Sequence, residues 1–268
     1  MSFKLKKRLA LAFVWLVLAL MYVPILILVI YSFTDSRSMS TWNGFTFYLY
    51  VQMISDSEIM SALANTLVIA VSSSLLAMLI GTVSAVGIFY LKVRARAAAN
   101  LVNQITVINA DIVTAVAFMV FFVRTKLLPD GYATLILTHT MITIPYVVLS
   151  VTPKLARLDP NLYDAGQDLG AGAFRSLVTV VFPQLIPGMI SGFALAFTLS
   201  LDDFVITKLN NGGTVDTIST YLYTRLAKKG VKPVLRALSA AIFIVSLIIL
   251  VSVNVYSKRK AKRAFGIK

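Results

Sequence analysis

Three aspartates lie inside or at the end of long apolar segments of this 268-residue chain. Asp111 falls within NADIVTAVAF, and Asp202 and Asp203 directly follow the apolar run that ends at Leu201. A carboxylate within a membrane costs about 2.5–3.5 kcal/mol on insertion scales, so it is expected to face a cavity or a polar partner. Three acidic groups along one path favour a cation that carries several ammonium groups. We therefore predict a substrate path at these positions.

Each of these aspartates also has a simpler interpretation. Asp111 would form a structural hydrogen bond to a neighbouring helix, and Asp202 and Asp203 would form the solvated end of a helix. His139 is the only histidine of the chain, and no cysteine or carboxylate is spaced to join it as a metal ligand. We expect His139 to form hydrogen bonds between helices, and the sequence predicts no metal site.

A second polar segment, DPNLYDAGQDLGAGAFRSLVTVVFPQLIP, covers residues 159–187. Asp159 followed by Pro160 predicts a helix start, with an N-cap acceptor and a proline in the first turn. Asp164 and Asp168 are four residues apart and would share one face of this helix. Gly170 tolerates the left-handed conformation that often ends a helix. The pattern predicts a short polar helix that ends at a glycine hinge.

A second helix is expected to begin near Ala171. Its apolar residues Phe174, Leu177, Val178 and Val181 have the spacing of an apolar stripe along one helix face. Two prolines, Pro183 and Pro187, are then expected to interrupt the start of the following apolar run, as gating or hinge positions. Such a pair of helices can transmit a push into the membrane, although an ordinary capped loop with a polar surface would give the same local pattern.

The helices that position these residues are indicated by how unevenly charge is distributed. The chain is 58% hydrophobic and only 13% charged, with a mean hydropathy of +0.84. A helix needs about 20 apolar residues to cross the hydrocarbon of a bilayer. Six transmembrane helices are predicted, at about 9–31, 62–90, 99–123, 132–152, 176–201 and 236–257. We expect an all-α polytopic membrane protein with one membrane domain over 1–268, whose segment 159–182 joins the fourth and fifth spans.

The lysines and arginines predict the orientation of these spans. With six spans both termini lie on one side, and that side would carry sixteen of the 25 basic residues. Basic residues favour the cytoplasmic side, so both termini are expected there, with the basic tail near anionic lipid. A membrane location also explains the net charge of +14 better than nucleic-acid binding does. The absence of cysteine excludes disulfides and thiolate metal sites.

The sequence holds no sign of its own energy source. No G-x-x-x-x-G-K-[ST] phosphate loop is present, and GTVSAVG at 81–87 lacks the lysine. No serine, histidine or carboxylate cluster forms a recognisable catalytic site. An ATP-driven transporter built on this chain would need a separate ATPase, so we predict no enzymatic activity and no cofactor for the chain itself.

The polar segment resembles the EAA loop of binding-protein-dependent ABC transporter permeases. DAGQDLGA followed by VVFPQLIPGMISG matches the pattern Glu-Ala-Ala, three residues to Gly, an apolar helix and a step with two prolines. Asp164 stands for the Glu and Gly166 for the second Ala. The resemblance implies a coupling helix that docks into a groove of the ATPase subunit. The docking residues that it implies are Asp164, Ala165, Gly166, Asp168, Leu169, Gly170 and Ala171, with hinges at Pro183 and Pro187.

The acidic stretches resemble the PotC-type permeases of spermidine/putrescine importers, which belong to the same family. ADIVTAVAF and FALAFTLSLDDFVITKL are similar to the corresponding stretches, with Ala110 in place of a proline. The resemblance implies a bacterial inner-membrane importer with a PotB-type second permease, two PotA-type ATPase copies and a PotD-type binding protein. Importers of ferric iron or thiamine remain alternatives, as does a self-sufficient secondary transporter or channel.

Overall fold

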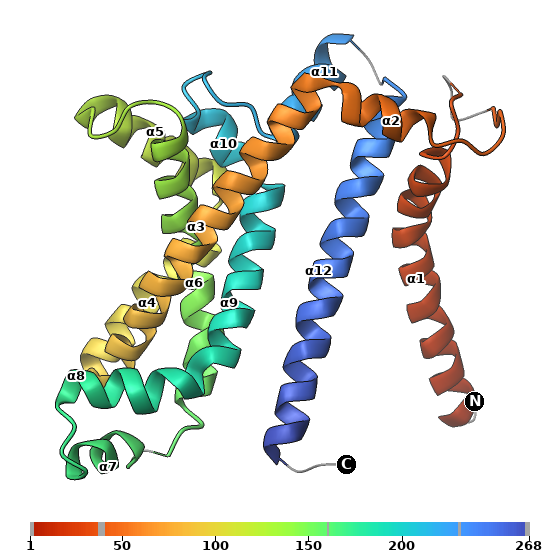
Figure 1. Cartoon of the computed structure of the whole chain (residues 1–268). Helices are drawn as coiled ribbons and strands as arrows, with labels where there is room; N and C mark the ends of the chain where they lie inside the picture. The colour runs from red at the N-terminus through yellow and green to blue at the C-terminus, as the bar shows by residue number, and fades with distance from the viewer. Residues whose placement is uncertain (1–2, 37–40, 160, 230–231, 266–268) are drawn as a thin grey trace. The chain divides into compact units, whose positions relative to one another are not determined.

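A computed structural model describes residues 3–36, 41–159, 161–229 and 232–265 (Figure 1). Every regular element in these ranges is a helix, which agrees with the all-α class expected from the sequence. The α-helices are α1 (Phe3–Tyr31), α2 (Tyr48–Ser55), α3 (Ser57–Tyr90), α4 (Val93–Ile108), α5 (Asp111–Thr125), α6 (Tyr132–Leu155), α7 (Leu162–Asp168), α8 (Ala173–Ser176), α9 (Phe182–Asp202), α10 (Val205–Asn210), α11 (Ile218–Lys229) and α12 (Val234–Phe265). A π-helical turn, η1 (Leu177–Val181), joins α8 to α9.

Within the described residues, four helices are long and apolar enough to cross a membrane. They are Leu11–Tyr31, Ser57–Tyr90, Tyr132–Leu155 and Ala173–Asp202. The bent pair α4 and α5 would form a fifth span, and Val234–Ile248 of α12 is a shorter apolar helix. The protein is therefore an all-helical polytopic membrane protein with four to five candidate spans.

The chain forms two compact units. The first comprises Met1–Met60 and Leu222–Ile248, and the second comprises Ser61–Tyr221 and Ile249–Lys268. In the first unit, the segment after α1 carries packed aromatic rings: Phe33 stacks on Phe45 at 5.2 Å and also contacts Tyr50. The predicted substrate path and the polar segment 159–182 both belong to the second unit.

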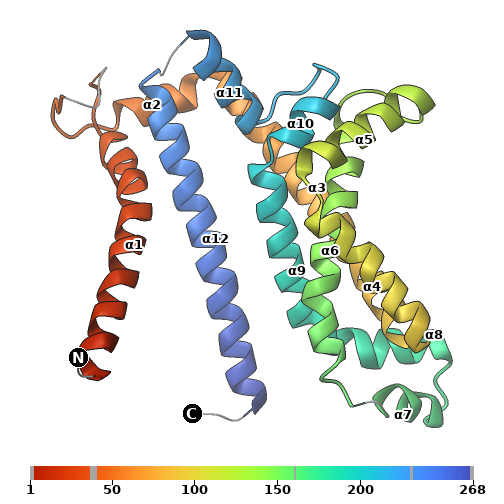
Figure 2. The same cartoon turned by 180° about the vertical axis from the view of Figure 1, so that it is seen from behind.

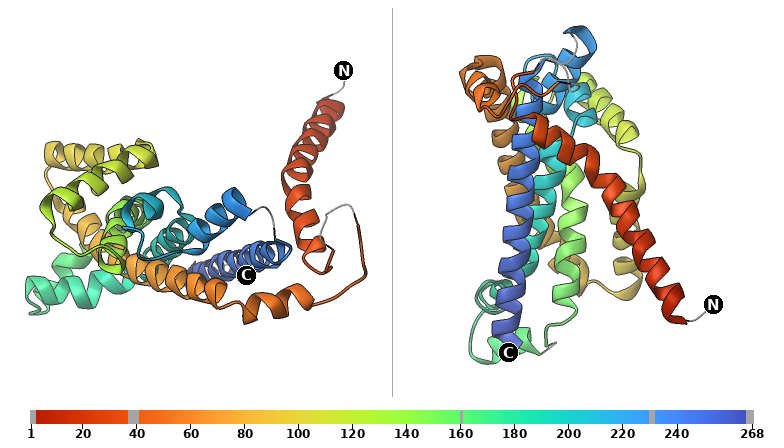
Figure 3. Two further views of the ribbon diagram at one scale, coloured as in Figure 1. Left: turned by 90° about the horizontal axis from the view of Figure 1, so that it is seen from above. Right: turned by 90° about the vertical axis from the view of Figure 1, so that its right-hand side faces the viewer.

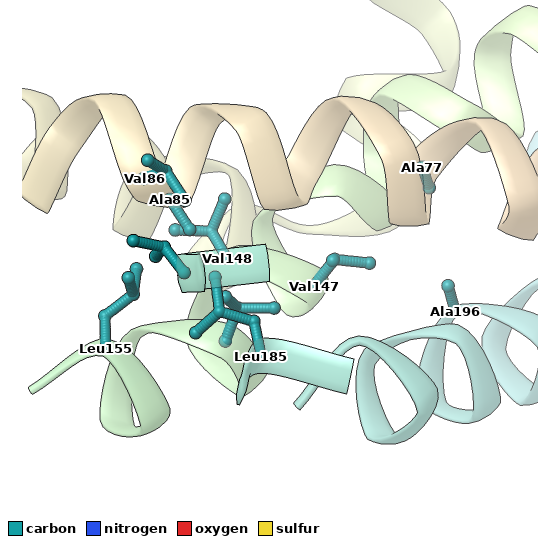
Figure 4. Packing of buried hydrophobic residues seen from close by; sticks show 10 residues of the cluster. Ala77, Ala85, Val86, Val147, Val148, Leu155, Leu185 and Ala196 are labelled. Carbon is teal, nitrogen blue, oxygen red and sulfur yellow. The ribbon is translucent and has the colours of Figure 1, made fainter. Parts of the chain in front are cut away.

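The core of the second unit lies where α6 packs between α3 and α9. Figure 4 shows Ala77, Ala85 and Val86 of α3 facing valines of α6, with Leu185 and Ala196 contributed by α9. Val147 of α6 is fully buried between two glycines: a Cβ atom on Gly81 of α3 would lie 2.8 Å from its Cβ, and one on Gly192 of α9 would lie 3.1 Å from its Cγ1. Small residues let membrane helices approach closely, and these two glycines bring α3 and α9 onto α6.

The prediction of one continuous membrane-spanning helix over 99–123 is wrong. The structure has two helices, α4 and α5, bent by 102° relative to each other. Figures 2 and 3 show that the two helices run in different directions. Asn109 and Ala110 between them are extended, with ψ of 144° and 133°. The helix breaks at the sequence Asn-Ala-Asp because Asn and Asp favour helix ends over helix interiors. Asp111 therefore begins a helix instead of lying in the middle of one.

Candidate functional site

A pocket of about 90 Å³ opens between α5, α6, α9 and the start of α10. Two acidic residues contribute to it, together with one histidine, one tyrosine, two small hydroxyl residues and three aliphatic residues. The lining residues are Asp111, His139, Ile142, Thr143, Tyr146, Leu199, Ser200, Asp203 and Ile206. An apolar wall with a few convergent polar groups is the usual composition of a small-molecule site.

Asp111 reaches the pocket because the chain bends just before it. The residue is exposed and stands in the first turn of α5. The N-terminal end of a helix carries partial positive charge, which favours a carboxylate at this position. The side chain next to the bend is also fixed locally, since Asn109 Nδ2 donates a hydrogen bond of 2.9 Å to Thr114 Oγ1.

Asp203 lies in the extended link between α9 and α10, and its carboxylate holds the start of α10. Oδ1 accepts the backbone N–H of Ile206 at 3.2 Å, and Oδ2 accepts the backbone N–H of Thr207 at 2.8 Å. Oδ2 also accepts the Thr207 hydroxyl at 3.0 Å. These bonds satisfy amides that the first turn of a helix leaves unpaired, and they fix the direction of the carboxylate. Asp203 is thus both a pocket residue and a helix cap.

His139 is 2% exposed and joins three elements. Its Nδ1 lies 2.7 Å from Ser200 Oγ of α9, and its Nε2 lies 3.1 Å from Thr207 Oγ1 of α10. Nε2 is 3.6 Å from Asp203 Oδ2, which is longer than a hydrogen bond. The expected role of His139 in hydrogen bonding between helices is confirmed. In the described part of the chain, no group of three or more His, Cys, Asp and Glu residues could hold a metal ion.

The structure brings two of the three predicted acidic residues together. Asp111 and Asp203 line one pocket, whereas Asp202 is exposed at the end of α9 and is not one of its lining residues. The simpler interpretation, the solvated end of a helix, fits Asp202. Sequence reasoning missed Tyr146 and the hydroxyls of Ser200 and Thr207, because their approach depends on how α6, α9 and α10 pack. The only available signal was a single histidine in an otherwise apolar span.

The polar segment forms a short helix as expected, but its start is shifted. Helix α7 begins at Leu162, with Asn161 as its N-cap residue, and not at Asp159. The Asp159 carboxylate instead accepts the backbone N–H of Asn161 at 2.9 Å, a local turn that precedes the helix. Pro160 lies outside the described residues. Asp164 is in the first turn of α7 and Asp168 is its last residue, and both are exposed.

Gly170 ends α7 in the left-handed conformation that the sequence predicts, with φ of +86°. The N–H of Gly170 donates to Gln167 O at 2.8 Å, and the N–H of Ala171 donates to Gly166 O at 3.2 Å. These two bonds form a Schellman motif, in which the residue after the C-cap must be left-handed and glycine is strongly favoured. The chain therefore reverses sharply after α7 and leads into α8.

Gly166 is the buried residue of α7 and seats the helix on α8 and η1. A Cβ atom on Gly166 would lie 2.9 Å from Ser176 Oγ and 3.3 Å from Val180 Cγ2. The other face of α7 points away from this contact, since Asp164, Ala165 and Asp168 are exposed there and Leu169 beyond them is 90% exposed. One face of α7 is thus packed on the membrane domain, and the other is open.

The chain after the hinge departs from the expected apolar stripe. Val181 is buried, but Phe174 is 81% exposed and Val178 is 45% exposed. The π turn η1 explains the difference, because its i to i+5 hydrogen bonding changes the phase of the helix. Pro183 falls in the first turn of α9, directly after η1, and Pro187 lies inside α9. Figure 1 shows that α8 and α9 run in different directions, so the chain changes direction between the polar segment and the span.

The sequence of this chain matches a known protein family. Residues 77–263 match the family described as "Binding-protein-dependent transport system inner membrane component". The chain belongs to this family of ABC transporter permeases. The permease is thus a multi-pass inner-membrane component of a bacterial transporter, with a transport function and no catalytic one of its own. Dependence on a binding protein and on ATP implies two kinds of partner, an ATPase and a periplasmic binding protein.

Named relatives and a solved structure agree with this assignment. The permease is 29% identical over 254 residues to the "Spermidine/putrescine transport system permease protein PotC" of Escherichia coli K12, covering 95% of this chain and 96% of that protein. It is 31% identical to the "Putrescine transport system permease protein PotI" of the same organism, over 83% of this chain and 81% of that protein. A bacterial ABC transporter involved in alginate import has a chain with the same fold, at a TM-score of 0.67, 18% identity and 95% coverage of both chains.

Proposed function

We propose that this permease carries polyamines such as spermidine and putrescine across the inner membrane. The observation that supports this most is the pocket in which Asp111 and Asp203 converge. Two relatives named as polyamine permeases match most of the chain, which supports the same substrate class.

The chemistry of the pocket suits an alkyl polyammonium ion. Carboxylates form charge-assisted hydrogen bonds with ammonium groups, and aliphatic walls accommodate the methylene chain between two such groups. Tyr146 adds an aromatic ring, whose face attracts cations. Asp111 is the carboxylate that we assign to the ammonium ion, because the oxygens of Asp203 already accept three hydrogen bonds. Asp202 then serves to guide the cation at the outer end of α9.

The proposed assembly follows from this function. Six spans, α1, α3, the bent α4 and α5 pair, α6, α9 and α12, place both termini in the cytoplasm and form one permease domain over residues 1–268. A PotB-type permease would complete the translocation path, two PotA-type ATPase copies would supply ATP hydrolysis, and a PotD-type binding protein would deliver substrate. No cofactor is required by this chain, because ATP binds to the ATPase.

We assign residues 159–182, between the fourth and fifth spans, to coupling. The open face of α7 is the docking surface for the ATPase, with Asp164, Ala165, Asp168 and Leu169 as its contacts. Gly166, Gly170 and Ala171 shape the seat and the hinge behind this face. Motion of α7 passes through α8 and η1 to α9, where Pro183 and Pro187 weaken the helical hydrogen bonding and allow the span to bend. The pocket then opens alternately to the two sides.

Uptake of radiolabelled spermidine tests the substrate class. A strain that lacks this gene and every other polyamine importer should lose ATP-dependent uptake, and the gene on a plasmid should restore it. Thiamine and ferric iron should not compete with the labelled spermidine. Undiminished uptake in the deletion strain, or competition by thiamine or iron instead of putrescine, would exclude the polyamine proposal.

A further inference from the structure

Five side chains form a continuous hydrogen-bonded chain at one wall of the pocket. Ser73 Oγ of α3 lies 3.0 Å from Ser200 Oγ of α9, which lies 2.7 Å from Nδ1 of His139. On the other edge of the ring, Nε2 lies 3.1 Å from Thr207 Oγ1, and that hydroxyl lies 3.0 Å from Asp203 Oδ2. The first four residues are at most 5% exposed, so their hydrogen bonds have to be made inside the protein.

The carboxylate at the end fixes the direction of each bond in this chain. An ionised carboxylate only accepts, so Thr207 donates its hydroxyl hydrogen to Asp203. Thr207 Oγ1 then accepts a hydrogen from Nε2 of His139. A neutral imidazole with its hydrogen on Nε2 has a lone pair on Nδ1, which accepts from Ser200. Ser200 has then used its hydrogen and can only accept from Ser73, whose hydroxyl also lies 3.3 Å from Ala70 O. From Ser200 through His139 to Thr207, each hydrogen points toward Asp203.

A second contact fixes the helix that carries this acceptor. Asn210 of α10 donates from Nδ2 to Ala115 O of α5 at 3.1 Å, which ties α10 to the helix that begins at Asp111. Helix α10 is therefore held by His139 on the α6 side and by Asn210 on the α5 side. These two ties set how Asp111 and Asp203 approach each other across the pocket.

We propose that His139 is a positioning residue, a neutral imidazole with its hydrogen on Nε2, that holds Thr207 and the Asp203 carboxylate in place beside the pocket. The effect of this positioning on polyamine transport rests on the proposed function. The direction of the hydrogen bonds depends only on the structure. The two parts are therefore measured separately.

Nitrogen-15 NMR measures the hydrogen-bond direction. His139 is the only histidine, so labelling with ¹⁵N-histidine gives this chain a single imidazole. In the transporter assembled in liposomes, the His139→Gln form of the same preparation identifies the signal. We expect a protonated Nε2 and an unprotonated Nδ1, as nitrogen–carbon correlations of the ring would show. A hydrogen on Nδ1, in a neutral or a doubly protonated ring, would overturn the proposal.

Transport kinetics measure the positioning. His139→Leu removes the donor to Thr207, and Thr207→Val removes the hydroxyl that donates to the Asp203 carboxylate. Each should raise the KM for spermidine about tenfold, because the carboxylate is no longer held in place, and should change the maximal rate little. His139→Gln should recover most of this loss, because its amide offers one acceptor and one donor. Thr138→Val is the matched control: Thr138 is buried next to His139 but donates only within α6, so its KM should stay unchanged.

The outcomes separate the two proposals. If the wild-type transporter carries no polyamine but Nε2 bears the hydrogen, the proposed function fails and the hydrogen-bond direction stands. If polyamines are carried while His139→Leu and Thr207→Val leave the KM unchanged, as Thr138→Val should, or lower only the maximal rate, the positioning role is wrong and the function stands.

Discussion

At the scale of single residues, the three aspartates that the sequence brings to attention differ in what they can do. Asp203 is committed to the amides of α10 and to Thr207, and Asp202 is exposed outside the pocket. Asp111 alone combines exposure, a helix N-terminal position and a place in the lining. A free carboxylate that faces a pocket can bind a cation without losing a structural hydrogen bond, so Asp111 should matter for substrate and little for folding.

Asp111→Asn tests this assignment. The substitution keeps the shape of the side chain and removes its charge, so the KM for spermidine should rise about tenfold or more, while the amount of protein in the membrane stays constant. Initial rates of uptake measured over a range of spermidine concentrations would show the change. An unchanged KM would mean that Asp111 has only a structural role.

At the scale of elements, α7 depends on one close approach. Gly166 stands where the family pattern has an alanine, and it lies against Ser176. A methyl group added at Gly166 would collide with that serine. The seat of α7 is therefore tighter than the resemblance alone predicts. The absence of a side chain at Gly166 lets α7 lie directly on α8 and η1.

Gly166→Ala should cost about 1–3 kcal/mol of local packing and displace α7 from its seat. We expect fewer substrate molecules imported per ATP hydrolysed, measured as uptake and hydrolysis in the same proteoliposomes. The double variant Gly166→Ala with Ser176→Gly should restore the ratio, because the second change removes the colliding hydroxymethyl group. Gly172→Ala is the matched control, since no atom lies within 4 Å of its added Cβ and its φ of −62° suits any residue. A failure of the double variant to recover would contradict this packing argument.

Some of these elements can be predicted from the sequence alone, and others cannot. Apolar runs predict the long helices, and Gly170 predicts the end of α7, because both depend on local physical chemistry. The bend at Asn109 and the π turn at Leu177–Val181 were not predicted, since an apolar run reads the same whether its helix is straight or broken. The hydrogen bonds of His139 with Ser200 and Thr207 depend on packing between segments that are distant in the sequence. The spacing of residues along the chain does not reveal such packing.

At the scale of the whole molecule, one face of α7 packs against α8 and η1, and the opposite face of α7 is exposed. Leu169 at 90% exposure and Phe174 at 81% exposure are large apolar side chains in a region rich in polar residues. Exposed apolar groups of this kind mark surfaces that a partner covers. In the proposed assembly, the ATPase is the partner that buries them.

Single cysteines test where the ATPase binds, because the natural chain contains none. Cysteine at Asp164, Asp168 or Leu169 should form a bifunctional crosslink to the ATPase in the assembled transporter, detected as a shifted band on gels. Cysteine at Lys126 is the control: this residue is exposed in the turn between α5 and α6 and should not react with the ATPase. Equal crosslinking at all positions, or none along α7, would place the ATPase elsewhere.

The bend between α4 and α5 has a consequence for hydration. The break at Asn109 and Ala110 interrupts the i to i+4 hydrogen bonding of a continuous helix, although the Asn109 N–H still donates to Ile105 O and Ala110 O still accepts from Val113 N–H. Bare peptide groups are not tolerated against lipid, and broken helices occur only where other protein or water satisfies them. Solvent admitted at this break would reach the Asp111 carboxylate, so an ammonium ion arriving there could exchange its hydration shell for protein oxygens one molecule at a time.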